Sequence, residues 1–351
     1  MLYLGLDVHS KWMSIRGFDA KTGESVDIDR QPNDEESLAE VFGNLPGPLY
    51  GAMESGTNSW AVYRILEPYF ERLVVVDPAT VWGRDARRGA KTDRRDAMKL
   101  AMKMYRGELE ALYVPDVKTQ DQRALARAKV NASRHVTKLV NEIGSALRSW
   151  GVIVDCSLLS KEGQRLIEAS KCKLQEHSLK ALEMWLEMLT LARKVEAELE
   201  QTVKAEAAKD EDCRRLMTIP DVGPLTALVV KAEIGDINRF AGAAQLICYS
   251  GLSPRVSQSA DSLYYGKLNR FCNKFLKYVL VLRAQGMARS RQENPMRQTY
   301  WRVVLRHRSN EAKIAVSRQL VRVIFRMLKN KENWDASKIT VRRGSLASSA
   351  A

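Results

Sequence analysis

The fold is decided by the apolar run Leu2-Tyr-Leu-Gly-Leu-Asp-Val8, which predicts a β-strand with the carboxylate of Asp7 near its end. Residues 12–18 alternate in part between apolar and polar after a polar turn, and residues 24–29 alternate weakly after a second turn. Three such runs joined by short turns predict a three-stranded meander.

Two helix-and-strand units follow the meander. Asn33-Asp-Glu-Glu36 predicts the start of a helix that runs to about residue 42, because acidic residues stabilise a helix N-terminus. Residues 49–53 predict a fourth strand, residues 59–69 a helix, and residues 72–76 a fifth strand. The order βββ-α-β-α-β-α predicts an α/β domain with a mixed sheet and helices on its faces.

Four carboxylates follow the ends of these strands. Asp7 ends the first strand and Glu54 follows the fourth, whereas Asp93 and Asp96 open a helix after the fifth. Residues three apart share a helix face, so Asp93 and Asp96 can point at one spot. Sites in such sheets form at strand ends, and four converging carboxylates suit two divalent ions that bridge a phosphodiester. In the alternative interpretation each residue is structural, as a turn former, a capping partner or the ion-pair partner of an arginine.

The segment around Asp93 and Asp96 is strongly basic. From Arg84 to Arg106 there are nine Lys or Arg and three Asp or Glu, a balance of +6. A carboxylate pair in such surroundings suits a site that holds metal and receives a polyanion. The residues of this segment that we expect to contact nucleic acid are Arg87, Arg88, Lys91, Arg94 and Arg95.

Composition indicates the same class of partner. The 351 residues carry a formal net charge of +14, which points to nucleic acid or an anionic surface. No apolar run reaches the roughly 18 residues of a membrane span, and the first residues lack the pattern of a signal peptide. The five cysteines are scattered without a CxxC pair, so we expect neither a zinc site nor disulfides, and a cytoplasmic location.

Strand character ends after Pro115. Apolar residues at three- and four-residue steps predict two long helices, separated by a less regular stretch over residues 155–173. The stripes consist of Ala132, Val136, Leu139, Ile143, Ala146 and Trp150, and of Leu179, Leu182, Leu186, Leu189, Leu199 and Val203. Such helices form either a hairpin within the chain or a coiled coil between subunits, since both arrangements bury the stripe.

A Pro- and Gly-containing turn lies at residues 217–226. It is close to the hairpin of a helix–hairpin–helix element, in which backbone N–H groups at a helix start, here Gly223, contact a phosphate. Asp221 stands where such hairpins usually have Gly, and its charge opposes a phosphate. The alternative is an ordinary turn before a helix over residues 225–233.

The C-terminal part holds most of the excess positive charge. From Arg283 to Arg343 there are sixteen Lys or Arg and four Asp or Glu, a balance of +12. Arg318, Arg322 and Arg326 form a stripe on a helix predicted over residues 310–328. The opposite side of that helix carries Val316, Leu320, Val323 and Met327. The charge excess exceeds what solubility requires, so we expect the stripe to contact phosphates.

Several short motifs resemble a known family of enzymes. GLDVH (5–9), MESGTNSW (53–60) and KTDRRDA (91–97) resemble the DEDD motifs of the insertion-sequence transposases of the IS110 family. GDINRF (235–240), GLSP (251–254) and SQSA (257–260) resemble the second domain of the same enzymes. The resemblance implies an RNase H- or RuvC-like first domain that binds Mg²⁺ or Mn²⁺ through Asp7, Glu54, Asp93 and Asp96. It also implies a nucleophilic serine, Ser259, which cuts and rejoins DNA through a covalent intermediate.

The same resemblance implies partners. Related proteins use a structured guide RNA, a bridge RNA, that pairs with donor and target DNA. They assemble as dimers and tetramers, so the resemblance favours a coiled coil between subunits for the two long helices. Gly266 and Lys267 keep their expected places, and Lys267 is a further expected nucleic-acid contact. The chain departs from the family pattern at Ala260 and Cys272, where relatives usually carry Gly, and at Lys277, where they carry Arg.

We therefore predict four regions. Residues 1–112 form the RuvC-like DEDD domain, 113–208 a helical coiled-coil region, 209–343 a mostly helical transposase domain, and 344–351 a disordered tail. Three alternatives to a guided transposase remain open. They are a site-specific DNA invertase of the same family, a RuvC-type nuclease in which metal-activated water attacks, and a non-catalytic nucleic-acid-binding scaffold.

Overall fold

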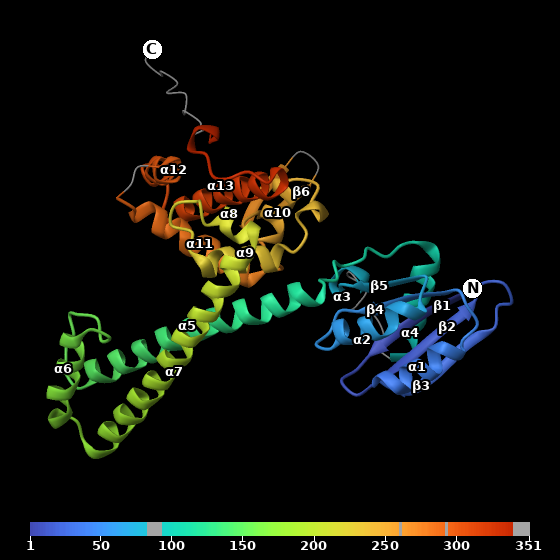
Figure 1. The fold of residues 1–351 in the computed structure, drawn as a ribbon, viewed down its shortest axis with the longest axis horizontal. Coiled ribbons are helices and arrows are strands. Elements are labelled where there is room, and N and C mark those ends of the chain that lie inside the picture. The colour runs from blue at the N-terminus through green and yellow to red at the C-terminus, as the bar shows by residue number, and fades with distance from the viewer. Residues whose placement is uncertain (83–92, 260–261, 292–293, 340–351) are drawn as a thin grey trace, which may run out of the picture. The chain divides into compact units, whose positions relative to one another are not determined.

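The computed structural model describes residues 1–82, 93–259, 262–291 and 294–339. The chain divides into two compact units, Met1–Val114 and Pro115–Ala351 (Figure 1). In the described part of the chain, the first unit combines a five-stranded sheet with helices, whereas the second is helical apart from one two-stranded hairpin. The further division predicted near residue 208 stays a prediction.

The sheet of the first unit is mixed, as predicted. Its strand order is β3-β2-β1-β4-β5, with antiparallel pairing from β3 to β1 and parallel pairing from β1 to β5. The elements are β1 (Leu2–Val8), β2 (Trp12–Asp19), β3 (Ser25–Pro32), α1 (Glu35–Asn44), β4 (Leu49–Glu54), α2 (Ser59–Leu66), β5 (Arg72–Val76), α3 (Pro78–Trp82) and α4 (Asp93–Arg106). The predicted meander and the two following helix-and-strand units are therefore confirmed.

Strand alternation gives the sheet two different faces. Leu4, Leu6 and Met53 belong to one apolar cluster, which includes buried side chains of α1 and α2. Tyr3 and Ala52, which alternate with them, belong to a second cluster that includes side chains of α3 and α4. Odd-numbered residues of β1 and even-numbered residues of β4 therefore face α4.

The α4 helix lies unusually close to β1. A Cβ atom on Gly5 would stand 1.8 Å from the carbonyl oxygen of Ala97, so only glycine permits this approach. Further along the helix, the ring of Tyr105 packs edge-on against Tyr3 at 5.0 Å and against Phe18 at 5.6 Å between centroids. Since Ala97 lies over Gly5 and Tyr105 over Tyr3, α4 runs antiparallel to β1.

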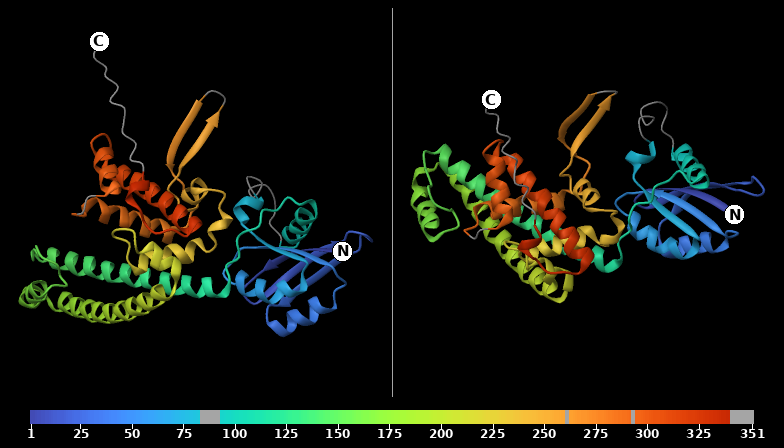
Figure 2. Two further views of the ribbon diagram at one scale, coloured as in Figure 1. Left: turned by 45° about the horizontal axis from the view of Figure 1, so that its top comes forward. Right: turned by 90° about the horizontal axis from the view of Figure 1, so that it is seen from above.

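The second unit begins with a long helical hairpin. The 33-residue α5 (Val117–Ser149) and the 34-residue α7 (Glu176–Lys209) pack against each other within the chain, so this pair is intramolecular (Figures 1 and 2). Their outer halves share a core that includes Ile143 and Leu182. The stretch expected to be less regular instead contains a helix, α6 (Lys161–Ser170), with Ser160 as its N-cap. Among the described helices, none is long and apolar enough to span a membrane.

Within its described residues, the second unit has six further α-helices and one β-hairpin. They are α8 (Glu211–Leu216), α9 (Pro224–Ile234), α10 (Ala243–Tyr249), β6 (Pro254–Ser259), β7 (Ser262–Leu268), α11 (Lys274–Arg289), α12 (Pro295–Val304) and α13 (Ser309–Asn330). Their common core also includes Ala126 of α5 and Val203 of α7. The long helical hairpin is thus continuous with the C-terminal helices at its inner end.

A buried carboxylate holds three parts of the second unit together. Glu233 of α9 is fully buried and accepts hydrogen bonds of 2.6 and 2.8 Å from the guanidinium of Arg127 in α5. Asn273, at the start of α11, donates to the same carboxylate at 2.7 Å. The hydrogen bond to Glu233 raises the pKa of Arg127. A buried carboxylate requires such partners, and they fix α5, α9 and α11 relative to one another.

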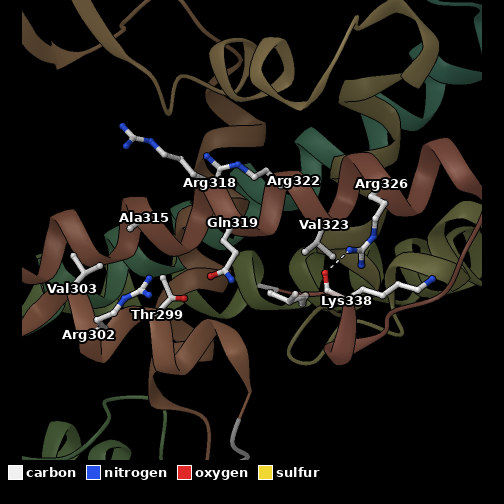
Figure 3. A pocket seen from close by; sticks show the side chains of 11 residues that line it. Thr299, Arg302, Val303, Ala315, Arg318, Gln319, Arg322, Val323, Arg326 and Lys338 are labelled. Atoms are coloured by element: carbon white, nitrogen blue, oxygen red, sulfur yellow. Dashed lines mark hydrogen bonds between the residues drawn. The ribbon is translucent and has the colours of Figure 1, made fainter. Parts of the chain in front are cut away.

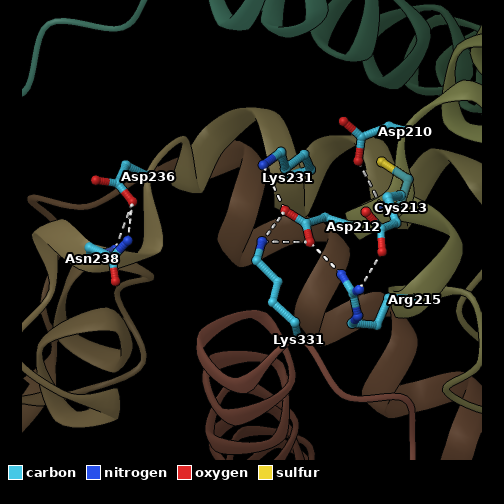
Figure 4. Close-up of polar contacts among 9 residues, drawn as sticks. Asp210, Asp212, Cys213, Arg215, Lys231, Asp236, Asn238 and Lys331 are labelled. Carbon is cyan, nitrogen blue, oxygen red and sulfur yellow. Dashed lines mark hydrogen bonds and ion pairs between the residues drawn. The ribbon is translucent and has the colours of Figure 1, made fainter.

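A second ionic cluster surrounds Asp212 of α8 (Figure 4). Its carboxylate accepts hydrogen bonds from Arg215 at 2.6 Å, Lys231 at 2.9 Å and Lys331 at 3.0 Å. Burial opposes ionisation of Asp212, but the hydrogen bonds from the two lysines outweigh it and lower the pKa. The cluster joins α8, α9 and the residue that follows α13, which is a structural role.

Replacing Gly5 with alanine tests the close approach of α4 to β1. The added methyl group must displace the Ala97 carbonyl, so we expect Gly5→Ala to lower the free energy of unfolding by about 1–3 kcal/mol in urea titrations. Gly43→Ala in α1 is the matched control. Its Cβ would meet only a Tyr69 ring atom at 3.9 Å, so stability should be unchanged or higher by about 0.5–1 kcal/mol. Equal effects of the two changes would contradict this packing.

Candidate functional site

Two predicted site residues lie side by side at one end of the sheet. Leu6 of β1 pairs with Met53 of the parallel strand β4, so the next pair in the register is Asp7 and Glu54. Neighbouring strands are about 4.8 Å apart. By strand alternation both side chains project on the face that α4 covers, and both are half-buried. Two carboxylates are therefore adjacent at the carboxyl end of parallel strands.

The start of α4 lies at the same end of the sheet. Because α4 runs antiparallel to β1, its N-terminal residues Asp93 and Asp96 lie towards the end of β1 that carries Asp7. Asp96 immediately precedes the residue that touches Gly5, and its side chain is 18% exposed. The side chain of Asp93 lies outside the described part of the structure. Backbone N–H groups at a helix start favour negative charge nearby, which suits this arrangement.

Basic side chains accompany two of these carboxylates. His9 Nε2 lies 3.3 Å from Asp7 Oδ2, and the His9 ring packs on Trp12 with centroids 3.9 Å apart. Lys99 Nζ lies 3.9 Å from Asp96 Oδ1, which is a long ion pair whose lysine is exposed. These contacts agree with the structural interpretation of each carboxylate taken singly. The contacts of His9 and Lys99 do not explain why β1, β4 and the start of α4 meet at one end of the sheet.

The described side chains contain no group of three or more His, Cys, Asp or Glu arranged to hold a metal ion. The donors at the sheet edge are all carboxylate oxygens, which is the ligand type that Mg²⁺ and Mn²⁺ prefer. Asp7 and Glu54 lie on neighbouring strands and match that preference, but the Asp93 side chain is not described. The four-residue metal site therefore stays a prediction.

Most of the basic residues around the start of α4 lie outside the described part of the structure. Arg87, Arg88 and Lys91 lie outside the described residues, as does the side chain of Arg94. Arg95 is exposed on the first turn of α4. A nucleic-acid contact for this group also stays a prediction.

The predicted nucleophile lies in the β6–β7 hairpin of the second unit. Ser259 is the last residue of β6 and pairs with Ser262 of β7, and its side chain is outside the described part. The hairpin projects away from the helices of its own unit (Figure 2). Its described surface is basic and aromatic, with Arg255 and Lys267 exposed and Tyr264 70% exposed.

The structure at the base of the β6–β7 hairpin accommodates one departure from the family pattern, Cys272. Gly251 has φ +66°, and a Cβ atom there would stand 2.3 Å from Cys272 Sγ. Glycine is thus required at 251 both for its backbone and for the close approach of Cys272. The neighbouring Asn273 caps α11 through a 2.9 Å bond from Leu276 N and also binds Glu233. Cysteine at 272 is accommodated without loss of this cap.

The turn between α8 and α9 has the backbone expected of a glycine position. Asp221 has φ +62°, in the left-handed region that aspartate tolerates better than most residues. Its carbonyl oxygen accepts a 3.2 Å hydrogen bond from Arg283. Gly223 precedes α9 as an N-cap that forms no side-chain hydrogen bond. A phosphate contact at Gly223 stays a prediction.

The arginine stripe of α13 is present, but its three members differ. The helix spans Ser309–Asn330, and the four apolar side chains predicted opposite the stripe are buried. Arg326 is neutralised by Glu332, with Nε and Oε1 2.7 Å apart, and it donates to the Lys338 carbonyl. Arg318 donates to the Leu252 carbonyl at 2.8 Å, and its pKa is lowered by burial and by the charge of Arg322. Arg318 and Arg322 have no carboxylate ion pair among the described residues.

Sequence analysis did not identify the other residues around this stripe. Thr299 and Arg302 of α12 and Gln319 of α13 line one pocket with the three arginines (Figure 3). Their types are common on helix surfaces. The pocket forms because α12 and α13 pack together, and no local sequence signal reports that pairing.

Comparison with known proteins agrees with this arrangement. The family described as "Transposase IS116/IS110/IS902 family" matches residues 213–302, and the DEDD transposase domain of IS110 elements matches residues 4–151. The transposase for insertion sequence element IS1111A of Coxiella burnetii is 27% identical over 70% of this chain and 68% of its own length. A probable family 20 transposase of Pseudomonas aeruginosa is 23% identical over 93% of this chain and 96% of its own length.

The family matches define the protein as a transposase, an enzyme that cleaves and rejoins DNA. The carboxylates at the end of the sheet and the basic helical second unit agree with this class. The two family matches cover both units in the order that the motifs indicated. The chain belongs to the IS110 family of insertion-sequence transposases.

Proposed function

We propose that this transposase cuts DNA by attack of Ser259 on a phosphodiester, assisted by divalent metal at Asp7, Glu54, Asp93 and Asp96. The observation that carries the proposal is the meeting of β1, β4 and the start of α4 at one end of the sheet. We infer that the first unit is RNase H- or RuvC-like. Its meander followed by parallel strands, with the matched DEDD domain, supports that inference.

The proposed step exchanges one phosphodiester for another. The Ser259 oxygen forms a bond to phosphorus, a deoxyribose oxygen leaves with the bond's electron pair, and the serine proton passes to a basic oxygen at the site. Bound Mg²⁺ would neutralise phosphate oxygens and lower the pKa of a coordinated hydroxyl group. Because the serine–DNA ester keeps the bond energy, a second DNA end can be joined by the reverse reaction without ATP.

The proposal requires the two units to act together. Asp7 and Glu54 belong to the first unit and Ser259 to the second. They meet either within one chain or between two chains, and the dimers and tetramers of related proteins favour the second arrangement. Phosphate contacts by Lys267, Gly223, Arg318 and Arg322 would hold the DNA backbone in place.

Removing Ser259 tests the covalent step. In Mg²⁺, we expect Ser259→Ala to lose the denaturation-resistant protein–DNA adduct and to reduce strand cleavage by about a thousandfold or more, because the nucleophile is absent. Ser257→Ala is the matched control in the same strand, and it should keep both. Radiolabelled DNA on a denaturing gel reports adduct and cleavage together.

One alternative mechanism is favoured by a specific finding. DEDD sites of the RuvC type activate water, and the matched first domain is of the DEDD class. If Ser259→Ala cleaves as fast as the parent and no adduct forms in either protein, water is the nucleophile and the serine mechanism is wrong.

Metal binding at this end of the sheet can be tested without a cleavage assay, by thermal unfolding. We expect Mg²⁺ to raise the thermal stability of the parent, by about 2.7 kcal/mol at a hundredfold excess over Kd. Asp7→Asn and Glu54→Gln should lose this increment, because each replaces a carboxylate ligand of the metal with a neutral amide. The exposed Glu36→Gln on α1 should behave as the parent. An increment unchanged by Asp7→Asn places the metal elsewhere.

We further propose a structured guide RNA as a partner, on the strength of the family resemblance and the +14 net charge. The protein, purified from cells that carry its gene with the flanking DNA, is expected to retain one discrete RNA through washes at moderate salt. Sequencing of the bound RNA checks this, with an unrelated basic protein as control. RNA of random sequence would instead indicate only non-specific binding, and an invertase that needs no guide.

A further inference from the structure

The pocket between α12 and α13 has features beyond those of a phosphate-binding patch. It measures about 720 Å³ and is lined by cations, by two polar residues and by apolar side chains. This volume lies within the roughly 300–1,000 Å³ of sites that bind small organic ligands. In Figure 3, Gln319 and Thr299 lie between Arg302 and Arg326, with Arg318 and Arg322 on one side.

The positive charge of the pocket is only partly neutralised. Arg326 pairs with Glu332, but Arg318 and Arg322 have no such partner among the described residues. Both lie on one side of the pocket, where the positive charge of Arg322 repels that of Arg318. An anion bound between them would relieve the repulsion.

Two of the residues that line the pocket each carry a buried polar atom with no hydrogen-bond partner among the described residues. Thr299 is 6% exposed, and its hydroxyl has no hydrogen-bond partner in the described part of the protein. The Gln319 Oε1 atom is likewise buried and unpartnered there. Leaving such a group unpaired costs about 1–3 kcal/mol, so both atoms are expected to have a partner in the working state.

A simple anion does not meet these requirements. Sulfate or a backbone phosphodiester can bind Arg318 and Arg322, but neither has a proton to donate to Gln319 Oε1. A nucleotide supplies both kinds of group, because its phosphate is anionic and its sugar or base carries N–H or O–H donors. The apolar walls formed by Val303, Val323 and Ile339 suit the flat face of a base.

We propose that the α12–α13 pocket binds one unstacked nucleotide of a nucleic acid strand. The phosphate contacts Arg318 and Arg322, and the sugar or base contacts Thr299 and Gln319. The inference rests on the proposed function only in taking nucleic acid as the substrate. The nucleotide comes either from an unpaired position of an RNA or from an extruded position of DNA, and the pocket chemistry is shared by both.

Fluorescence anisotropy with the full-length protein tests this pocket. The probes are two labelled hairpin oligonucleotides, one fully paired and one with a single bulged nucleotide, each made as RNA and as DNA. Gln319→Leu and Thr299→Val should weaken binding of the bulged probe about five- to tenfold and that of the paired probe less than twofold. Thr299→Ser keeps the hydroxyl and should bind as the parent does.

Charge variants separate the pocket from general attraction. Arg318→Ala and Arg322→Ala should weaken the bulged probe more than the paired one, and each should lower its salt slope by about 1. Arg306→Ala removes an exposed charge that does not line the pocket, and it should weaken both probes equally. Since the Thr299 hydroxyl has no hydrogen-bond partner among the described residues, Thr299→Val should leave the thermal unfolding temperature unchanged.

The outcomes are distinct from those of the cleavage test. The nucleotide-binding pocket is supported if the parent prefers the bulged probe and Gln319→Leu loses this preference. A preference for the bulged probe with RNA alone identifies an RNA ligand. A preference with DNA alone identifies an extruded DNA nucleotide. Equal binding of bulged and paired probes, or no effect of Gln319→Leu and Thr299→Val, overturns it. Ser259→Ala should leave all these affinities unchanged, so failure of the serine mechanism would not affect the result.

Discussion

The contact between the α4 backbone and β1 at Gly5 is the constraint on which the first unit depends. A helix normally stands well away from a sheet because side chains lie between them. Here the absence of a side chain at Gly5 lets the Ala97 carbonyl reach the strand itself. The ring of Tyr105 against Tyr3 then fixes the direction of the helix. Position and direction together bring Asp96 and the start of α4 to the edge that carries Asp7 and Glu54.

The second unit depends on a different interaction, the buried charge of Glu233. Its carboxylate is shared by Arg127 from the long hairpin and by Asn273 from the segment after β7. Asn273 is followed by α11 and preceded by Cys272, which packs against Gly251 before the β6–β7 hairpin. The position of the hairpin that carries Ser259 is therefore tied to the helical body at its base, while its far end projects.

Much of the first unit was predictable, because its signals are local. Alternation and turn residues located all five strands, and the carboxylates at strand ends followed from them. The closeness of α4 to β1 was not predictable, since Gly5 reads as an ordinary strand residue until its partner is known. In the second unit, helical periodicity predicted α13 and its buried side, but not α6. It also gave no account of which arginines are neutralised, because Glu332 lies outside the periodic stretch. The resemblance favoured pairing of the two long helices between subunits, and this is wrong for α5 and α7, which pack against each other within the chain. The apolar stripes could not decide this, because they are equally well buried either way.

We propose that Asp7, Glu54 and the start of α4 form one metal site at the carboxyl end of β1 and β4. Diffraction from crystals soaked in Mn²⁺, recorded where manganese scatters anomalously, tests it most directly. If the site binds metal, an anomalous peak should lie at about 2.0–2.3 Å from oxygens of both Asp7 and Glu54. A carboxylate of α4 should bind the ion directly or through a water molecule. Ordered Asp7 and Glu54 side chains with no peak between them, at Mn²⁺ concentrations that support cleavage, would contradict it.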